Sequence, residues 1–206
     1  LDVPKNATVF DLKGKYIYPS FIDIYSDYGV PANKFQRKDP GPQMESNYKG
    51  AFGWNQAIRS NVESYKVFTH SAEKADELKK LGFASVLSCA KDGIVRGSGA
   101  LVNLNNSREN ESIIIDKAAA FYSFNKGSSP QDYPSSLTGA IALLRQTYLD
   151  AAWYAANKNR SEYNITLDEF NKLQGLPSVF EANDKFNDLR AAKLAKEFNV
   201  KYIIKA

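Results

Sequence analysis

The sequence predicts a mixed α/β protein in which helices and strands alternate as in an incomplete (β/α) barrel. A helical pattern over 71–81 ends at Gly82, and an apolar run over 83–89 follows as a buried strand. Nearer the end, strand patterns at 178–181 and 200–204 flank a helix that begins at 183–184. A strand, a helix and a parallel strand in this order require a right-handed crossover, as barrel units do.

A complete barrel needs eight strand–helix units and about 250 residues. The chain has 206 residues, and its patterns give about five barrel strands. We therefore expect the N-terminal part of a barrel at 19–206, belonging to a longer protein and preceded by a separate segment at 1–18. Such a piece exposes two sheet edges, which predicts self-association, a missing C-terminal portion, or an open sheet. Because Leu1 is not a methionine, we expect the natural start to precede it, and the compartment stays open between cytoplasm and bacterial periplasm.

Composition excludes several classes of protein. A net charge of +4 is spread along the chain, and the basic doublets at 37–38 and 79–80 are isolated, so nucleic-acid binding is not expected. No run approaches the roughly 20 apolar residues of a membrane span. Cys89 is the single cysteine, which excludes an internal disulfide and a zinc site built on cysteines.

Several connecting segments carry less regular patterns. Residues 29–55 lack periodicity and hold many Pro and Gly residues, so we expect a long, partly flexible loop, with a short helix over 54–62 after it. Residues 93–104 look like a hairpin with a glycine-rich corner at Gly97 and Gly99; a phosphate loop is the alternative, but the third glycine and the following helix are missing.

Further along, two strands are expected at 112–116 and 118–124, then a long amphipathic helix from Leu137. Thr166 and Glu169 form the pattern of a capping box at the start of the next helix.

The stretch from Gly14 to Gly29 organises the rest of the chain. It predicts a turn at Gly14, a proline step, a buried strand over 21–25 and a polar loop at Asp27. This stretch resembles the first barrel strand of the amidohydrolase superfamily, in the branch around imidazolonepropionases, where the pattern is Gly-Lys…Pro-Gly-Phe-Ile-Asp-x-His-x-His. Pro19 and the run Phe21-Ile22-Asp23 match this pattern, whereas Tyr25 and Asp27 stand at the two histidine positions.

A second resemblance lies in the strand–helix–strand ending, which is similar to the family segment Pro-Val-x-x-His-Ala-x…Asp-Ile-x-x-Ala-x-x-Leu-Ala-x-Glu-Phe-Gly. Asp188, Leu194 and Phe198 are among the matches, and Glu181 stands at the histidine position. The resemblance implies a TIM barrel flanked by a small β-sandwich made from both chain ends. Residues 1–18 would then contain the last N-terminal strand of that sandwich.

In the family, the histidine pair binds the catalytic metal. Zinc lowers the pKa of its bound water to about 7 and so supplies hydroxide. A phenol with a pKa near 10 is a poor zinc ligand at neutral pH, and Asp27 alone would bind a metal weakly. The single histidine, His70, precedes a helix cap and is expected to be a surface or packing residue. Zinc is therefore implied by the resemblance only, and no cofactor is expected in this chain.

Barrel sites lie at the carboxyl ends of the strands. The candidate binding residues there are Tyr25, Asp27, Asp92, Glu181 and Asn183. Three hypotheses follow: a degenerate amidohydrolase-like domain, which could be fused to an active copy; a hydrolase of cyclic amides or similar C–N bonds with a different ligand set; or an unrelated α/β module that binds a small molecule such as a sugar, or a peptide, through Tyr-rich loops.

Overall fold

The computed structural model describes residues 3–33, 42–159 and 162–206. Its centre is one six-stranded sheet with the strands in chain order. They are β1 (Phe21–Ser26), β2 (Phe83–Ser88), β3 (Val95–Asn103), β4 (Ile113–Ser123), β5 (Ser178–Glu181) and β6 (Tyr202–Lys205). β1 is parallel to β2, and β4, β5 and β6 are mutually parallel, whereas β3 is antiparallel to both of its neighbours. Five strands thus share one direction, with β3 inserted among them.

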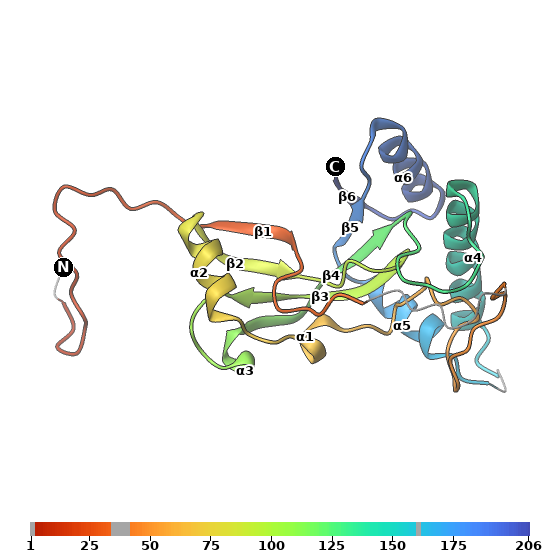
Figure 1. Cartoon of the computed structure of the whole chain (residues 1–206), viewed down its shortest axis with the longest axis horizontal. Coiled ribbons are helices and arrows are strands. Elements are labelled where there is room, and N and C mark those ends of the chain that lie inside the picture. Colours follow the sequence, from red (N-terminus) through yellow and green to blue (C-terminus); the bar gives the residue numbers. More distant parts are fainter. Residues whose placement is uncertain (1–2, 34–41, 160–161) are drawn as a thin grey trace.

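The sheet is barrel-like rather than flat. β1 and β6 are its two edges, yet their carboxyl ends come within reach of each other, since the Lys205 ammonium lies 5.4 Å from the centre of the Tyr25 ring. Figure 1 shows the sheet in the middle of the molecule, with α4 and α6 on the right beside the carboxyl ends of the parallel strands and α2 at the opposite end. The mixed α/β class predicted from the sequence is confirmed, and the sheet is nearly closed with six strands.

Six helices are present in the described residues: α1 (Ser64–Val67), α2 (Ala72–Lys80), α3 (Glu109–Ser112), α4 (Leu137–Ala156), α5 (Ile165–Leu173) and α6 (Lys185–Glu197). Side chains cap four of them, because Ser71, Ser136, Asn164 and Asp184 each accept a backbone N–H of the first turn. None of the helices in this part of the chain could cross a membrane.

The capping box predicted at Thr166 is wrong, because Asn164 caps α5. Thr166 lies one residue inside the helix, where its hydroxyl accepts the N–H of Gly53 at 2.8 Å. The Thr166 hydroxyl therefore holds the loop at 42–55, and Gly53 lies 113 residues earlier in the chain.

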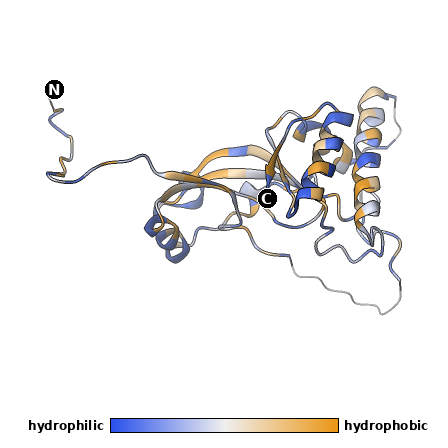
Figure 2. Ribbon diagram, turned by 90° about the horizontal axis from the view of Figure 1, so that it is seen from above, coloured by the Kyte–Doolittle hydropathy of each residue, from blue (hydrophilic) through white to orange (hydrophobic). Residues whose placement is uncertain are grey.

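Two apolar cores lie between the sheet and its helices. The larger packs α4, α5 and α6 against β4 and β5, with Tyr122, Leu144, Phe170 and Phe180 almost fully buried. The smaller packs α2 against β2 and β3. Figure 2 shows the apolar residues along the strands and on the helix faces. A third cluster lies on the other face of the sheet and is centred on Phe121, with Leu87, Cys89 and Val179.

The hairpin expected over residues 93–104 does not form. Residues 95–103 form one strand, and its two glycines allow close approach of neighbouring chains instead of turning a corner. A Cβ at Gly97, where φ is +80°, would meet the Val62 carbonyl oxygen, and one at Gly99 would meet the Phe121 ring. Because these glycines lie inside a strand and no helix follows, the phosphate-loop alternative is wrong. The two strands expected over 112–124 are likewise one long strand, β4.

The long loop is partly held in place. Residues 42–55 form neither helix nor strand, but the buried Gln131 side chain donates to the carbonyls of Met44 and Trp54, each at 3.0 Å. The helix expected over 54–62 does not form; Ile58 instead makes a bridge to Val95 of β3. Residues 34–41, which belong to the same predicted loop, lie outside the described residues.

Residues 3–20 form no strand and extend away from the sheet in Figure 1. The predicted turn is present, since Gly14 has a φ of +77° and the N–H of Lys15 donates to the Leu12 carbonyl at 2.9 Å. That this segment supplies a strand of a β-sandwich stays a prediction.

Candidate functional site

The carboxyl ends of the parallel strands form the mouth of the barrel-like sheet, and the candidate residues lie around it. Tyr25 is the penultimate residue of β1, and Asp27 follows that strand. Glu181 ends β5, Asn183 lies two residues beyond it, and Asp92 lies in the loop between β2 and β3. Because parallel strands end at the same edge of a sheet, residues far apart in sequence meet here.

The centre of the mouth is a buried arginine from β3. The Arg96 side chain is 3% exposed, and its Nη2 lies 2.7 Å from Glu181 Oε2. Its Nη1 donates to the Tyr25 hydroxyl, and its Nε donates to the Gly93 carbonyl at 3.0 Å. One guanidinium therefore joins β1, the start of β3 and the end of β5.

These contacts fix the charges of the three groups. Burial raises the pKa of the Tyr25 phenol well above its usual range, more than the nearby Arg96 charge lowers it. Burial also acts to raise the pKa of Glu181, but the charge and hydrogen bond of Arg96 outweigh it and hold that pKa below the ordinary value. At neutral pH the mouth thus contains a neutral phenol, a carboxylate and a guanidinium.

Two lysines add positive charge near the Tyr25 ring. The Lys91 ammonium lies 4.7 Å from the ring centre and 3.5 Å from Asp27 Oδ1, and Lys205 approaches the same ring from β6. Asp27 is exposed, with 68% of its side chain accessible. Its carboxylate is therefore the more solvated of the two acidic groups near Tyr25.

Asp92 has a different environment. It lies 2.9 Å from Arg59 Nη1 and accepts the Ser128 N–H at 2.6 Å and the Ser128 hydroxyl at 2.7 Å. Both charges of this pair are nearly buried. Asp92 therefore ties two loops together, and its oxygens are already occupied by protein donors.

The fit of these residues to a zinc ion is poor. Zinc sites use imidazole, thiolate and carboxylate donors, commonly three or four together. The residues described contain no group of three or more His, Cys, Asp or Glu side chains placed to hold a metal. Burial raises the pKa of the Cys89 thiol to about 12, and His70 Nδ1 lies 2.8 Å from the Tyr28 hydroxyl, outside the candidate set. Glu181 and Tyr25 both face Arg96, which would repel a second cation.

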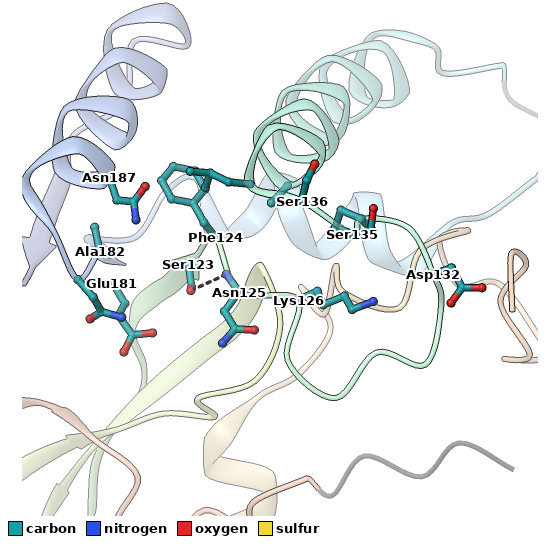
Figure 3. A pocket seen from close by; sticks show the side chains of 14 residues that line it. Ser123, Phe124, Asn125, Lys126, Asp132, Ser135, Ser136, Glu181, Ala182 and Asn187 are labelled. Atoms are coloured by element: carbon teal, nitrogen blue, oxygen red, sulfur yellow. Dashed lines mark hydrogen bonds between the residues drawn. The ribbon is translucent and has the colours of Figure 1, made fainter. Parts of the chain in front are cut away.

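A polar cleft of about 660 Å³ opens beside the mouth, between the ends of β4 and β5 and the first turns of α4 and α6 (Figure 3). Its walls carry hydroxyl and amide groups, an aromatic ring and a few charges; they include Ser123, Phe124, Asn125, Lys126, Ser135, Ser136, Glu181, Asn183 and Asn187. The ends of parallel strands are a common place for ligands in α/β proteins. Of the sequence candidates, Glu181 and Asn183 line this cleft.

A second hollow of about 290 Å³ contains the other acidic candidates. Asp27, Lys91 and Asp92 line it, together with the buried Cys89. The structure therefore divides the candidates, with Tyr25 and Glu181 joined by Arg96, Asn183 in the larger cleft, and Asp27 and Asp92 in the smaller.

Sequence reasoning missed Arg96, Lys91 and Lys205. Arg96 gave one signal, since it is a lone charge within a run of small and β-branched residues that is otherwise suited to a buried strand. The two lysines gave none, because each stands beside a strand end where a solvated charge is ordinary.

Comparison with known proteins gives one structural likeness. No family profile matches the sequence, and no curated protein sequence matches it significantly. An amidohydrolase from Thermotoga maritima MSB8 has a similar structure, with a TM-score of 0.72 and 20% identity over 99% of this chain. This chain covers 55% of the Thermotoga chain, so it spans about half the length of that protein. The chain has an amidohydrolase-like fold.

Proposed function

We propose that this chain is the N-terminal part of a (β/α) barrel of the imidazolonepropionase-like branch, and that its mouth no longer supports metal-dependent hydrolysis of C–N bonds. The amidohydrolase-like fold and the motif at 19–23 support the family assignment. Residues 1–18 would then supply a strand of a flanking β-sandwich.

One observation carries the loss of hydrolysis. Of the three positions where the resemblance expects histidines, two hold side chains that bond to Arg96, and the third holds the exposed Asp27. A protonated phenol and a carboxylate already paired with a guanidinium are weak donors to zinc. The barrel-like sheet is compatible with the arrangement of the family strands, while the chemistry of the mouth suits an internal ion pair.

Zinc titration tests this proposal. The purified wild-type chain should bind no stoichiometric zinc, and Asp27→Ala should leave its metal content unchanged, as measured by elemental analysis after dialysis. Asp150→Ala, which removes an exposed carboxylate from α4, is the matched control. Stoichiometric zinc that is lost only in Asp27→Ala would contradict the proposal.

A binding role is the second candidate function, and the cleft of about 660 Å³ favours it. Its hydroxyl and amide groups suit a small polar ligand, and no metal is needed for such binding. A thermal-shift screen of small polar compounds should give hits that Asn183→Ala abolishes. Asn171→Ala, on α5, is the control. Hits that persist in Asn183→Ala would place binding elsewhere.

The half-length match to the Thermotoga protein suggests where activity would reside. The family resemblance implies further barrel strands with another histidine and a catalytic aspartate, C-terminal to Ala206. We propose that any hydrolysis belongs to a longer protein, in which this part acts as a degenerate domain beside an active copy. The sequence of the complete gene product tests this, by whether His-x-His recurs downstream.

A further inference from the structure

We infer that Arg96 is the resident cation of the mouth, a protein side chain that supplies the positive charge which the family resemblance assigns to a metal. The inference rests on the proposed absence of a metal site, and it names the Arg96 guanidinium as the group that takes the place of the metal. The guanidinium bonds to Tyr25 on β1 and to Glu181 on β5, which are two of the three positions expected to hold metal ligands.

The geometry suits an arginine specifically. A guanidinium is a planar fork with several donors, so separate nitrogens can reach groups on different strands. Here Nη1, Nη2 and Nε each have one protein acceptor, from β1, from β5 and from the Gly93 turn before β3. A lysine ammonium at the same position could not hold all three acceptors in one plane.

The charge is largely isolated from water, because the Arg96 side chain is 3% exposed. With Glu181 ionised, the guanidinium and the carboxylate balance each other, and the phenol of Tyr25 is neutral. The exposed ion pair Arg145–Glu197, whose side chains are 37% and 39% accessible, provides an internal comparison on the surface.

Chemical rescue tests whether the cation, rather than the bulk of the side chain, is what the mouth requires. Arg96→Ala should lower the thermal unfolding midpoint by about 10 °C, because it leaves a carboxylate without its partner. Millimolar ethylguanidinium should recover about half of this loss with a saturable concentration dependence. Ethylurea, which has a similar shape but no charge, and ethylguanidinium added to Arg145→Ala should have no such effect.

If Arg96→Ala does not fold unaided, the yields of folded protein on refolding with ethylguanidinium and with ethylurea give the same readout. Equal recovery by both compounds, or by neither, would overturn the inference. Rescue by ethylguanidinium alone supports it.

A second experiment asks whether Arg96 excludes a metal. In the triple variant Tyr25→His, Asp27→His, Glu181→His, zinc affinity should rise at least about tenfold when Arg96→Ala is added, because a fixed neighbouring charge is removed. Cobalt(II) absorption would report the coordination directly. Equal affinity with and without Arg96 would overturn the inference. Zinc binding by the wild-type chain would instead refute the proposed function, so the two failures are distinguishable.

Discussion

The Glu181→Gln substitution measures how much the central ion pair stabilises the fold. It keeps the size of the side chain and an oxygen that can accept from Arg96, but it removes the negative charge. Arg96 then remains 3% exposed with no carboxylate at 2.7 Å. The substitution therefore isolates the charge from the packing.

The size of the effect follows from burial. Breaking a fully buried pair costs about 3–5 kcal/mol, whereas an exposed pair contributes about 0–1 kcal/mol. The Glu181 side chain is 19% exposed, and Gln keeps one hydrogen bond, so we expect a loss of about 2–3 kcal/mol. Glu197→Gln applies the same change to the exposed Arg145 pair and should cost about 1 kcal/mol or less.

Urea unfolding at pH 7, followed by tryptophan fluorescence and by circular dichroism, gives both free energies of unfolding. The two probes should coincide, and the dependence on urea should keep the same slope in each variant, so that the difference in midpoint reports stability. A loss in Glu181→Gln no larger than that in Glu197→Gln would refute the reasoning, because the buried pair would then behave as a solvated one.

Three further predictions use other features. The pKa of Glu181 is lowered in the fold from an ordinary 4.5, and Arg96, Tyr25 and Lys205 are the groups that face it. The contribution of Glu181 to the free energy of unfolding is therefore complete above about pH 4.5 and is lost as the pH falls through the folded pKa. The difference in stability between wild type and Glu181→Gln should shrink below about pH 4.5. Gly97→Ala should lower the free energy of unfolding, measured in urea, by about 1–3 kcal/mol, because φ is +80° and the new Cβ would press on the Val62 carbonyl. Gly14→Ala is the control: its φ of +77° is similar but its surroundings are open, so it should cost less. Cys89 is 1% exposed with a pKa of about 12, so a thiol reagent at pH 8 should label it only after unfolding; rapid labelling of the native protein would contradict the burial.

Local patterns predict much of the fold. The strands expected at 21–25, 83–89 and 178–181 agree with the structure to within a residue or two, because each is a short apolar run bounded by turn residues. The helices expected from residue 71 and from Leu137 are also present, and the side chains of Ser71 and Ser136 cap them through chemistry that acts within one turn. Local signals suffice wherever the stabilising partner is a near neighbour in the chain.

Non-local contacts explain the failures. Gly97 and Gly99 indicate a corner from sequence alone, but Val62 and Phe121, which require glycine there, are distant in the chain. The candidate site fails in the same way, since Arg96 acts through residues 71 and 85 positions away. Tyr25 and Glu181 are candidates because of their place at strand ends, which topology dictates, whereas their common partner depends on the direction of β3, which no local pattern predicts.

The reversed direction of β3 has a consequence for how this rim can change. In the parallel strands, the residues at the rim are the last of each strand, and the loops follow them directly. β3 reaches the same rim with its first residues, Val95 and Arg96, and is paired there with Tyr122 near the end of β4. The positive charge at the centre is thus carried by a strand that is paired with its neighbour, and of the described loops around the rim the turn at Gly93 is the one that also bonds to it.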